Sequence, residues 1–308
     1  MEMKASKSVF PHSVKIYEVG PRDGLQNEKN IIPTKTKIEL INHLSKTGLR
    51  SIEVTSFVAP KWIPQLADGA DVLQGIEKNP SIHYPVLVPN IQGLERALES
   101  KAKEIAVITA ASETFSLKNT HCTIEESLSR IQAVMDLAKP QNIPVRAYIS
   151  CCLGCPYEGE ISPEKVAPLA QKLLAMGCYE ISLGDTIGVG TPNKAENLIQ
   201  TLVHSYKIPI HQLAVHFHDT YGQAIANIYA CLKLGISVID SSIAGLGGCP
   251  YAKGATGNVA TEDVLYLLEG LNIETGVDLQ KLIEVTKFVV ELTGRPPRSK
   301  VAQAILAT

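Results

Sequence analysis

The sequence predicts one α/β domain, residues 1–308, folded as a (β/α)8 TIM barrel with an extra C-terminal helix. Eight short β-rich runs occur along the chain, and segments with helical apolar spacing separate most of them. Strands that alternate with helices indicate a parallel sheet, and 308 residues are a normal length for one closed barrel. A doubly wound open sheet is the alternative, but no glycine-rich dinucleotide fingerprint follows the first run.

The predicted strands are short and rich in β-branched and aromatic residues. In chain order they are VKIYEV (14–19), SIEVT (51–55), YPVLV (84–88), EIAVIT (104–109), VRAYIS (145–150), YEISLG (179–184), LAVHFH (213–218) and SVIDSSIA (237–244). Apolar residues recur every three or four positions between them, as at Ile38, Ile41 and Leu44, which predicts helices. Gly177 and Gly235 stand just before the next strand, as C-capping glycines do.

The two ends of the chain differ from this alternating pattern. Residues 277–293 are predicted to form the extra helix, packed on the barrel. Residues 1–12 are expected to be a short disordered N-terminus, and residues 295–308 a C-terminal tail.

The amino-acid composition excludes some classes of function. Apolar residues make up 45% of the chain, which permits a large core, and a net charge of −2 does not suggest a nucleic-acid partner. No apolar run reaches the roughly 18 residues of a membrane helix. The N-terminus has no apolar h-region, so we expect no targeting peptide and a cytoplasmic location. Seven cysteines, an odd number, favour a reducing compartment over a disulfide framework.

A histidine pair closes the seventh predicted strand, in the stretch AVHFHDTYG. Residues two apart on a strand point to one face, so His216 and His218 project together. They fall at the strand end where a barrel places its chemistry, and two imidazoles there are half of a divalent metal site. The alternative is one core histidine and one that caps the loop.

Further ligands are expected from neighbouring strands. In a closed barrel strand one lies beside strand eight, which lies beside strand seven, so the loops after them converge. The first of these loops carries Asp23 and the last ends at Asn258. Together with His216 and His218 they form a mixed oxygen and nitrogen set that suits Mg²⁺ or Mn²⁺.

Other polar residues mark the predicted strand ends. Arg22 could stabilise a developing oxyanion or clamp a carboxylate, although a surface salt bridge is the alternative. Glu53 lies inside an apolar strand, where a carboxylate must be paired. Asp185 follows the sixth strand in a glycine-rich turn. Each of these carboxylates could be a general base, an orienting group or a cap.

Two segments of the chain contain cysteines with a possible chemical role. Cys249 lies in the glycine-rich loop AGLGGCPYAKGATG, where an accessible thiol could transfer a proton, unless it is buried as a small apolar residue. CCLGCPYEGE holds a C-x-x-C without a second pair, so a structural metal is not favoured. It is expected to line a pocket, with Arg146 and Tyr148 sharing a strand face and binding substrate.

Six stretches together resemble the 3-hydroxy-3-methylglutaryl-CoA lyase family, from about Val14 to Ala302. They are VGPRDGLQNE, EVTSFVAPKW, SCCLGCPYEG, SLGDTIGVGTP, VHFHDTYGQA and GLGGCPYAKGATGN. The resemblance implies a metal-dependent cleavage of hydroxymethylglutaryl-CoA to acetyl-CoA and acetoacetate, usually in leucine degradation. It implies the same barrel fold and Mg²⁺ or Mn²⁺ as cofactor.

The resemblance also implies roles for individual residues. The metal ligands are Asp23, His216, His218 and Asn258; Arg22 steadies the thioester enolate, Cys249 is the catalytic thiol, and Glu53, Asp185 and Glu262 are supporting acids. Asp185 is our candidate for the base that takes the C3 hydroxyl proton, with Glu53 as its partner. Arg295, Arg298 and Lys300 are expected near CoA phosphates.

The resemblance leaves some alternatives open. A homocitrate or isopropylmalate synthase is the nearest one, since R-D-G-x-Q and H-x-H-D mark the wider superfamily. A metal aldolase that acts on a free hydroxy acid and a non-catalytic acyl-CoA-binding relative are the others. The C-terminus, AILAT, lacks the cysteine linked to redox regulation in the mitochondrial enzymes. A homodimer is plausible, and an acyl-CoA is the expected partner.

Overall fold

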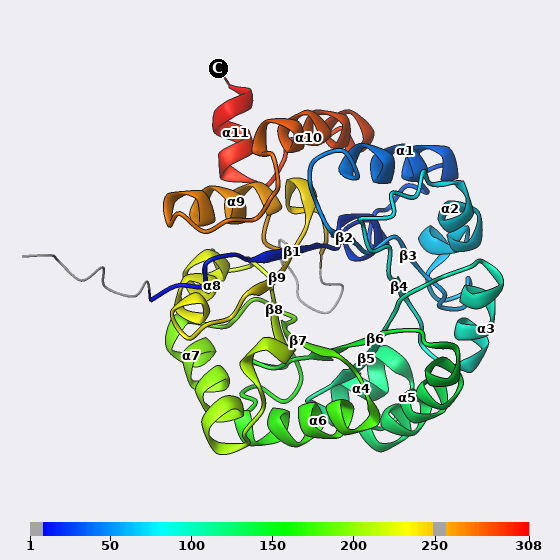
Figure 1. The fold of residues 1–308 in the computed structure, drawn as a ribbon, viewed down its shortest axis with the longest axis vertical. Coiled ribbons are helices and arrows are strands. Elements are labelled where there is room, and N and C mark those ends of the chain that lie inside the picture. The colour runs from blue at the N-terminus through cyan, green and yellow to red at the C-terminus, as the bar shows by residue number, and fades with distance from the viewer. Residues whose placement is uncertain (1–8, 249–256, 308) are drawn as a thin grey trace, which may run out of the picture.

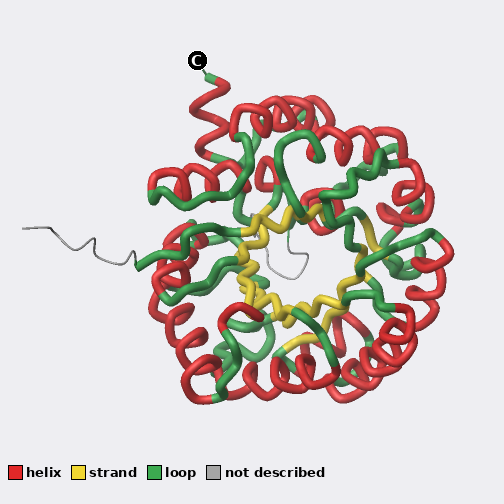
Figure 2. The backbone as a smooth tube through the Cα atoms, in the orientation of Figure 1, coloured by secondary structure: helices red, strands yellow, loops and turns green. Residues whose placement is uncertain are grey.

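The predicted strands form one parallel barrel (Figures 1 and 2) in a computed structural model that describes residues 9–248 and 257–307. The strand order is β2-β1-β9-β8-β7-β6-β5-β4-β3, and each strand pairs in parallel with its neighbours in this order. The strands are β1 (Lys15–Glu18), β2 (Ser51–Ile52), β3 (Thr55–Ser56), β4 (Val86–Leu87), β5 (Ile105–Ala110), β6 (Val145–Ser150), β7 (Glu180–Asp185), β8 (Leu213–Phe217) and β9 (Val238–Ser241).

The second predicted strand is interrupted at Glu53 and Val54. Its first half, β2, pairs with β1, whereas its second half, β3, pairs with β4. The amide of Glu53 donates to the carbonyl of Glu18 at 2.8 Å, and the amide of Val54 donates to that of Pro85 at 3.0 Å. The segment therefore stays hydrogen-bonded to both of its neighbours across the interruption. Because β2 and β3 together occupy one strand position, the nine strands fill eight positions in the barrel. The prediction of a (β/α)8 barrel is confirmed.

Helices surround the barrel as an outer ring (Figure 2). They are α1 (Thr34–Leu44), α2 (Gly69–Gly75), α3 (Ile91–Glu99), α4 (Glu113–Thr120), α5 (Ile124–Ala138), α6 (Pro163–Met176), α7 (Pro192–Gln200), α8 (Ala224–Lys233), α9 (Thr261–Gly270), α10 (Leu279–Thr293) and α11 (Lys300–Leu306). Gly177 ends α6 at φ +109°, a conformation that favours glycine. Within residues 9–248 and 257–307, no helix is long and apolar enough to cross a membrane.

The C-terminal region is more ordered than predicted. The extra helix is present as α10, which contacts α1 and α9 (Figure 1). The expected tail instead contains α11, because Ser299 accepts a capping hydrogen bond from the Ala302 amide and donates to Asp263 at 2.6 Å. Ala302 is buried, and α11 contacts α9. At the other end, the carbonyl of His12 accepts the Glu274 amide, so order begins before residue 13.

The barrel interior is unusually polar for a packed core. Arg146, Glu53, Asp240 and Ser182 all project from strand positions and are fully or almost fully buried. Buried charges are tolerated only when they are paired. These paired polar side chains lie inside the barrel, below the carboxyl ends of the strands.

Candidate active site and metal centre

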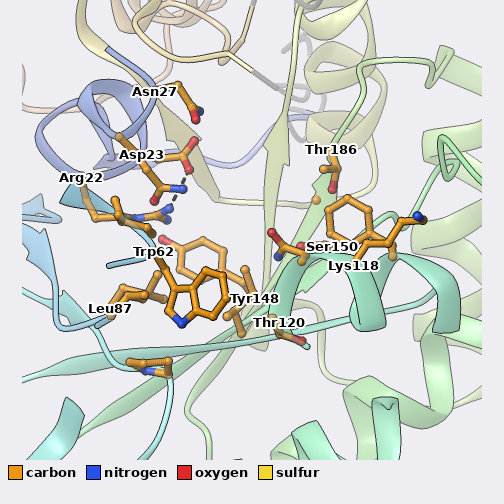
Figure 3. A pocket seen from close by; sticks show the side chains of 18 of the residues that line it. Arg22, Asp23, Asn27, Trp62, Leu87, Lys118, Thr120, Tyr148, Ser150 and Thr186 are labelled. Atoms are coloured by element: carbon orange, nitrogen blue, oxygen red, sulfur yellow. Dashed lines mark hydrogen bonds and ion pairs between the residues drawn. The ribbon is translucent and has the colours of Figure 1, made fainter. Parts of the chain in front are cut away.

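A cavity of about 730 Å³ opens at the carboxyl ends of the strands. Its floor includes Arg22, Asp23 and Tyr148, and its mouth includes Trp62 and Lys118 (Figure 3). These residues come from segments that are far apart in the sequence and that meet at one rim of the barrel. Active sites of (β/α)8 enzymes lie at this end.

Arg22 and Asp23 reach the cavity from a short π-helix, Gly20–Gly24, that directly follows β1. The amide of Gly24 donates to the carbonyl of Val19, five residues earlier, at 3.1 Å. From this turn both side chains line the cavity. Single π-helical turns of this kind are frequent at functional sites.

The predicted metal ligands converge. Asp23, His216 and His218 offer ligand atoms that lie within 4.8 Å of one another. The Asp23 Oδ2 atom lies 3.8 Å from the His216 Nε2 atom. Asn258 pairs with His218 through a backbone bridge, and its amide nitrogen donates to Asp23 Oδ2 at 2.7 Å. The four residues that were predicted as ligands because their strands are neighbours in a closed barrel therefore lie together.

The protonation states suit a cation. Burial, and next the neighbouring His216, lower the pKa of His218 to about 4, so this imidazole is neutral and holds a free lone pair at neutral pH. Burial opposes ionisation of Asp23, but Arg22 and then His216 lower its pKa to about 2. One carboxylate and imidazole nitrogens, with an amide beside them, fit a divalent ion of the Mg²⁺ or Mn²⁺ type.

Glu53 is paired with Arg22, as expected for a carboxylate inside an apolar strand, and it orients the guanidinium. Its Oε2 atom accepts from Arg22 Nε at 2.8 Å and from the Tyr148 hydroxyl at 3.0 Å, whereas its Oε1 atom has no hydrogen-bond partner among the described residues. Arg22 also donates to Asp23 Oδ1 at 2.6 Å. Two of its five N–H groups are thus used, and the guanidinium is held at the cavity floor.

Arg146 is not in the cavity, which corrects its predicted role in substrate binding. It is fully buried, and its guanidinium donates to Glu180 at 2.6 Å and to both oxygens of Asp240 at 3.0 and 2.6 Å. It also lies over the Tyr17 ring, 4.0 Å from the centroid. Arg146 and Tyr148 share a strand face, but two residues along a strand separate them by about 6.6 Å in depth. Only Tyr148 reaches the cavity.

Asp185 is also placed away from the cavity. It is the last residue of β7, and its register partner on β8 is Phe217, whereas the inward position, Gly184, pairs with His216. Its two oxygens accept the amides of Val189 and Gly190 at 3.1 and 2.8 Å. Burial raises the pKa of Asp185 to about 6, although the hydrogen bonds from these turn amides lower it. The strand alternation therefore assigns it to the glycine-rich turn, and the prediction that it is the general base is not supported.

The sequence predicts roles for two groups of cysteines, Cys249 and the C-x-x-C segment. Cys249 lies outside the described residues. Among the described residues, the free thiols are Cys122, Cys151, Cys152, Cys155, Cys178 and Cys231, and all six are buried. The C-x-x-C segment is therefore packed as small apolar residues, with Cys152 donating to the Ile149 carbonyl at 3.0 Å.

The cationic residues at the cavity mouth differ from those predicted. Lys29, Lys118 and Arg130 line it. By contrast, Arg295 and Arg298 do not line it: Arg298 donates to the Gly247 carbonyl at 2.7 Å, and Arg295 pairs with Glu28 at the edge of the cavity. No periodic pattern in the sequence identifies these residues, because Lys29 lies in a loop whereas Lys118 and Arg130 lie on the exposed faces of α4 and α5.

Asp240 is a buried residue in contact with a candidate metal ligand that sequence reasoning missed. It is a lone carboxylate within the apolar run of β9, and its Oδ2 atom lies 3.2 Å from His216 Nδ1. The same signal, a carboxylate inside an apolar strand, had identified Glu53 and could have identified Asp240.

Comparison with known proteins agrees with this geometry. A family model described as HMGL-like matches residues 13–289. The mitochondrial hydroxymethylglutaryl-CoA lyase of Rattus norvegicus is 59% identical over 300 residues, covering 97% of this chain and 92% of the relative. The cytoplasmic 3-hydroxy-3-methylglutaryl-CoA lyase of the same species is 58% identical over 297 residues, covering 96% and 86%. The crystal structure of hydroxymethylglutaryl-CoA lyase from Pseudomonas aeruginosa has a TM-score of 0.94 and 55% identity, covering 97% and 99%.

Proposed function

The chain belongs to the HMGL-like family, and we infer that it cleaves 3-hydroxy-3-methylglutaryl-CoA to acetyl-CoA and acetoacetate with the help of a divalent cation. One observation carries this inference. Asp23, His216 and His218 converge beside the guanidinium of Arg22 on the floor of one cavity. A metal site and a fixed positive charge side by side suit the cleavage of a C–C bond next to a thioester.

We propose that Asp23, His216, His218 and Asn258 hold the cation, with Asn258 presenting its amide oxygen. Mg²⁺ or Mn²⁺ fits this set of hard oxygen and imidazole donors. When bound, the cation supplies a Lewis acid that lowers the energy of an alkoxide at the C3 oxygen of the substrate.

Arg22 stabilises the negative charge that develops on the thioester oxygen when the C2–C3 bond breaks. Glu53 and Asp23 hold its guanidinium from two sides, so the charge is oriented before substrate binds. Since Asp185 does not line the cavity, a lining group must accept the proton of the C3 hydroxyl. Cys249 then protonates the acetyl-CoA carbon, a role that rests on the resemblance of its loop.

The nucleotide of the acyl-CoA substrate is proposed to bind toward the cavity mouth. Lys29, Lys118 and Arg130 are cationic there, and phosphates bind lysine and arginine side chains through charge-assisted hydrogen bonds. Lys118→Ala is expected to raise KM for the acyl-CoA with little change in kcat. A cytoplasmic location and a homodimer stay predictions.

The test is acetoacetate release from hydroxymethylglutaryl-CoA. EDTA-treated protein is assayed before and after addition of Mg²⁺ or Mn²⁺, beside His216→Ala. His204→Ala, which removes an exposed histidine, is the matched control. We expect the metal to restore turnover in the wild type and in the control but not in His216→Ala.

Two outcomes would contradict the proposal. Turnover that EDTA does not lower would remove the cation from the reaction. Release of free CoA from acetyl-CoA and a 2-oxo acid, without acetoacetate formation, would favour the condensing enzymes of the superfamily. Cys249→Ala with full turnover would remove only the thiol from the mechanism.

A further inference from the structure

We propose that Asp240 is a positioning residue that fixes the tautomer of His216, so that the Nε2 lone pair faces the metal site. This inference rests on the proposed metal site and adds a residue that does not touch the cavity. In metal sites the second ring nitrogen of a histidine ligand usually donates to a fixed acceptor, and that bond sets both the ring orientation and the tautomer.

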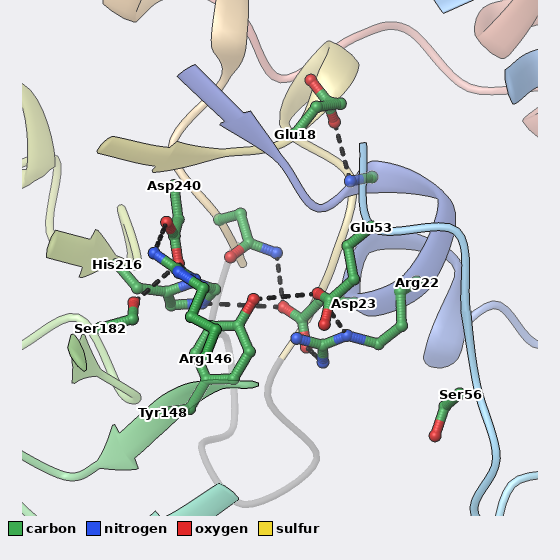
Figure 4. Close-up of polar contacts among 12 residues, drawn as sticks. Glu18, Arg22, Asp23, Glu53, Ser56, Arg146, Tyr148, Ser182, His216 and Asp240 are labelled. Atoms are coloured by element: carbon green, nitrogen blue, oxygen red, sulfur yellow. Dashed lines mark hydrogen bonds and ion pairs between the residues drawn. The ribbon is translucent and has the colours of Figure 1, made fainter. Parts of the chain in front are cut away.

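The barrel places Asp240 against His216. The two residues are register partners on the neighbouring strands β8 and β9, and both are buried. Asp240 Oδ2 lies 3.2 Å from His216 Nδ1, whereas the opposite ring nitrogen, Nε2, lies 3.8 Å from Asp23 Oδ2 (Figure 4). The imidazole therefore bridges the buried carboxylate and the metal site.

The surroundings of Asp240 identify which partner carries the proton. Its Oδ1 atom accepts from Arg146 at 2.6 Å, and its Oδ2 atom accepts from Arg146 at 3.0 Å and from the Ser182 hydroxyl at 2.7 Å. A carboxylate that a guanidinium holds at both oxygens is ionised and acts only as an acceptor. The hydrogen in the contact with His216 must therefore sit on Nδ1, which leaves Nε2 unprotonated when the imidazole is neutral.

Arg146 keeps this carboxylate in place from below. The guanidinium also donates to Glu180, which in turn accepts from Lys15 at 2.9 Å. The charges alternate along this series, and none of the three residues Arg146, Glu180 and Asp240 is more than slightly exposed. Asp240 is thus anchored without any contact to solvent or substrate.

The second histidine of the pair provides a contrast within the same site. His218 Nδ1 has no carboxylate partner among the described residues, and outside the metal site its ring contacts the backbone of Thr186. The orientation of His216, by contrast, depends on a fixed carboxylate. An effect of Asp240 on metal binding should therefore act through His216.

The first experiment reads the tautomer directly in the unaltered protein. Long-range ¹H–¹⁵N correlation spectra of ¹⁵N-histidine-labelled protein, recorded metal-free at pH 8 and assigned with His216→Gln, distinguish Nδ1–H from Nε2–H. We expect Nδ1–H at His216. Nε2–H would overturn the proposal, and the tautomer is read in the unaltered protein, with His216→Gln needed only for the assignment.

The second experiment measures Mn²⁺ affinity of Asp240→Asn by titration. The Asn amide can present only one oxygen, and with that oxygen on Arg146 its NH₂ group faces His216 Nδ1 and favours the Nε2–H tautomer. We expect the Kd for Mn²⁺ to rise about 10- to 100-fold, as when such partners are lost from metal sites. Saturating Mn²⁺ should recover much of the lost turnover.

Ser182→Ala is the matched control, because it removes one neutral donor from the same oxygen and leaves the Asp240–His216 contact. We expect its Kd to stay within about threefold of wild type. A folded Asp240→Asn that binds Mn²⁺ as wild type does, while His216→Ala does not, would refute the positioning role and leave the metal site standing. Unchanged Mn²⁺ binding in His216→Ala would instead refute the metal site itself.

Discussion

Replacement of Glu53 by Gln tests whether the buried carboxylate orients Arg22 for catalysis. Glu53 accepts from Arg22 Nε at 2.8 Å, and Asp23 holds the same guanidinium at 2.6 Å. Gln keeps an oxygen acceptor of the same shape but removes the charge. The hydrogen bond to Asp23 is therefore expected to keep the Arg22 guanidinium in the site, but its orientation should be less fixed.

The size of the effect follows from the contacts. A hydrogen bond to a charged group contributes about 1.5–3 kcal/mol, and because Gln still accepts one hydrogen bond we take the lower half of that range. About 1.5–2 kcal/mol corresponds to a fall in kcat/KM of roughly 10- to 30-fold. Since burial raises the pKa of Glu53, a neutral side chain is tolerated there, and little global stability should be lost.

The assay is acetoacetate release at saturating Mn²⁺, with Glu104→Gln as the control. Glu104 is also a nearly buried carboxylate, bonded to His83 and Tyr179, but it precedes β5 at the opposite end of the barrel. An equal loss of kcat/KM in both variants would show a general effect of buried charge. An unchanged kcat/KM in Glu53→Gln would refute the orienting role of Glu53.

Three further predictions concern stability. Burial raises the pKa of Glu262 from 4.5 to about 7. Its contribution to the free energy of unfolding, on the order of 3 kcal/mol, is therefore present below pH 4.5 and lost as the pH rises through 7. Glu262→Gln should remove this part of the pH dependence of urea unfolding. Asp185→Asn should leave Mn²⁺ affinity unchanged but lower the unfolding free energy by about 1–3 kcal/mol, because one turn amide loses its acceptor; a loss of turnover without a loss of stability would contradict this. Ser299→Ala removes the α11 cap at a cost of about 1 kcal/mol, so amide exchange within Lys300–Leu306 should quicken while exchange in the barrel strands does not change.

The sequence predicted the parts of the molecule that follow from periodicity and closure. Alternation along a strand placed His216 and His218 on one face, and barrel closure brought Asp23 and Asn258 beside them. The same alternation would have excluded Asp185, had the last residue of β7 been identified correctly. A strand that ends at Gly184 leaves Asp185 in the following loop, where alternation does not set its direction, and composition alone does not fix that boundary.

Depth and side-chain partners were harder to predict. Arg146 shares a face with Tyr148, but periodicity does not say how far below the rim a residue lies. Asp240 gave only the general signal of a charge in an apolar strand, and its partners come from β6, β7 and β8. The helix α11 is short, and its order depends on the contact of Ser299 with Asp263 rather than on an apolar pattern of its own.

The π-helical turn at Gly20–Gly24 has a consequence for attempts to rebuild this chemistry in another protein. The backbone of this turn, with the Gly24 amide bonded to the Val19 carbonyl, sets the directions of the two side chains, so an Arg-Asp pair grafted onto an ordinary α-helix would not reproduce them. Here both Arg22 and Asp23 line the cavity, and Arg22 donates to Asp23 Oδ1 at 2.6 Å. Transplantation should therefore move the whole segment from Val19 to Leu25, backbone included, and a one-residue deletion within it should separate charge stabilisation from metal binding.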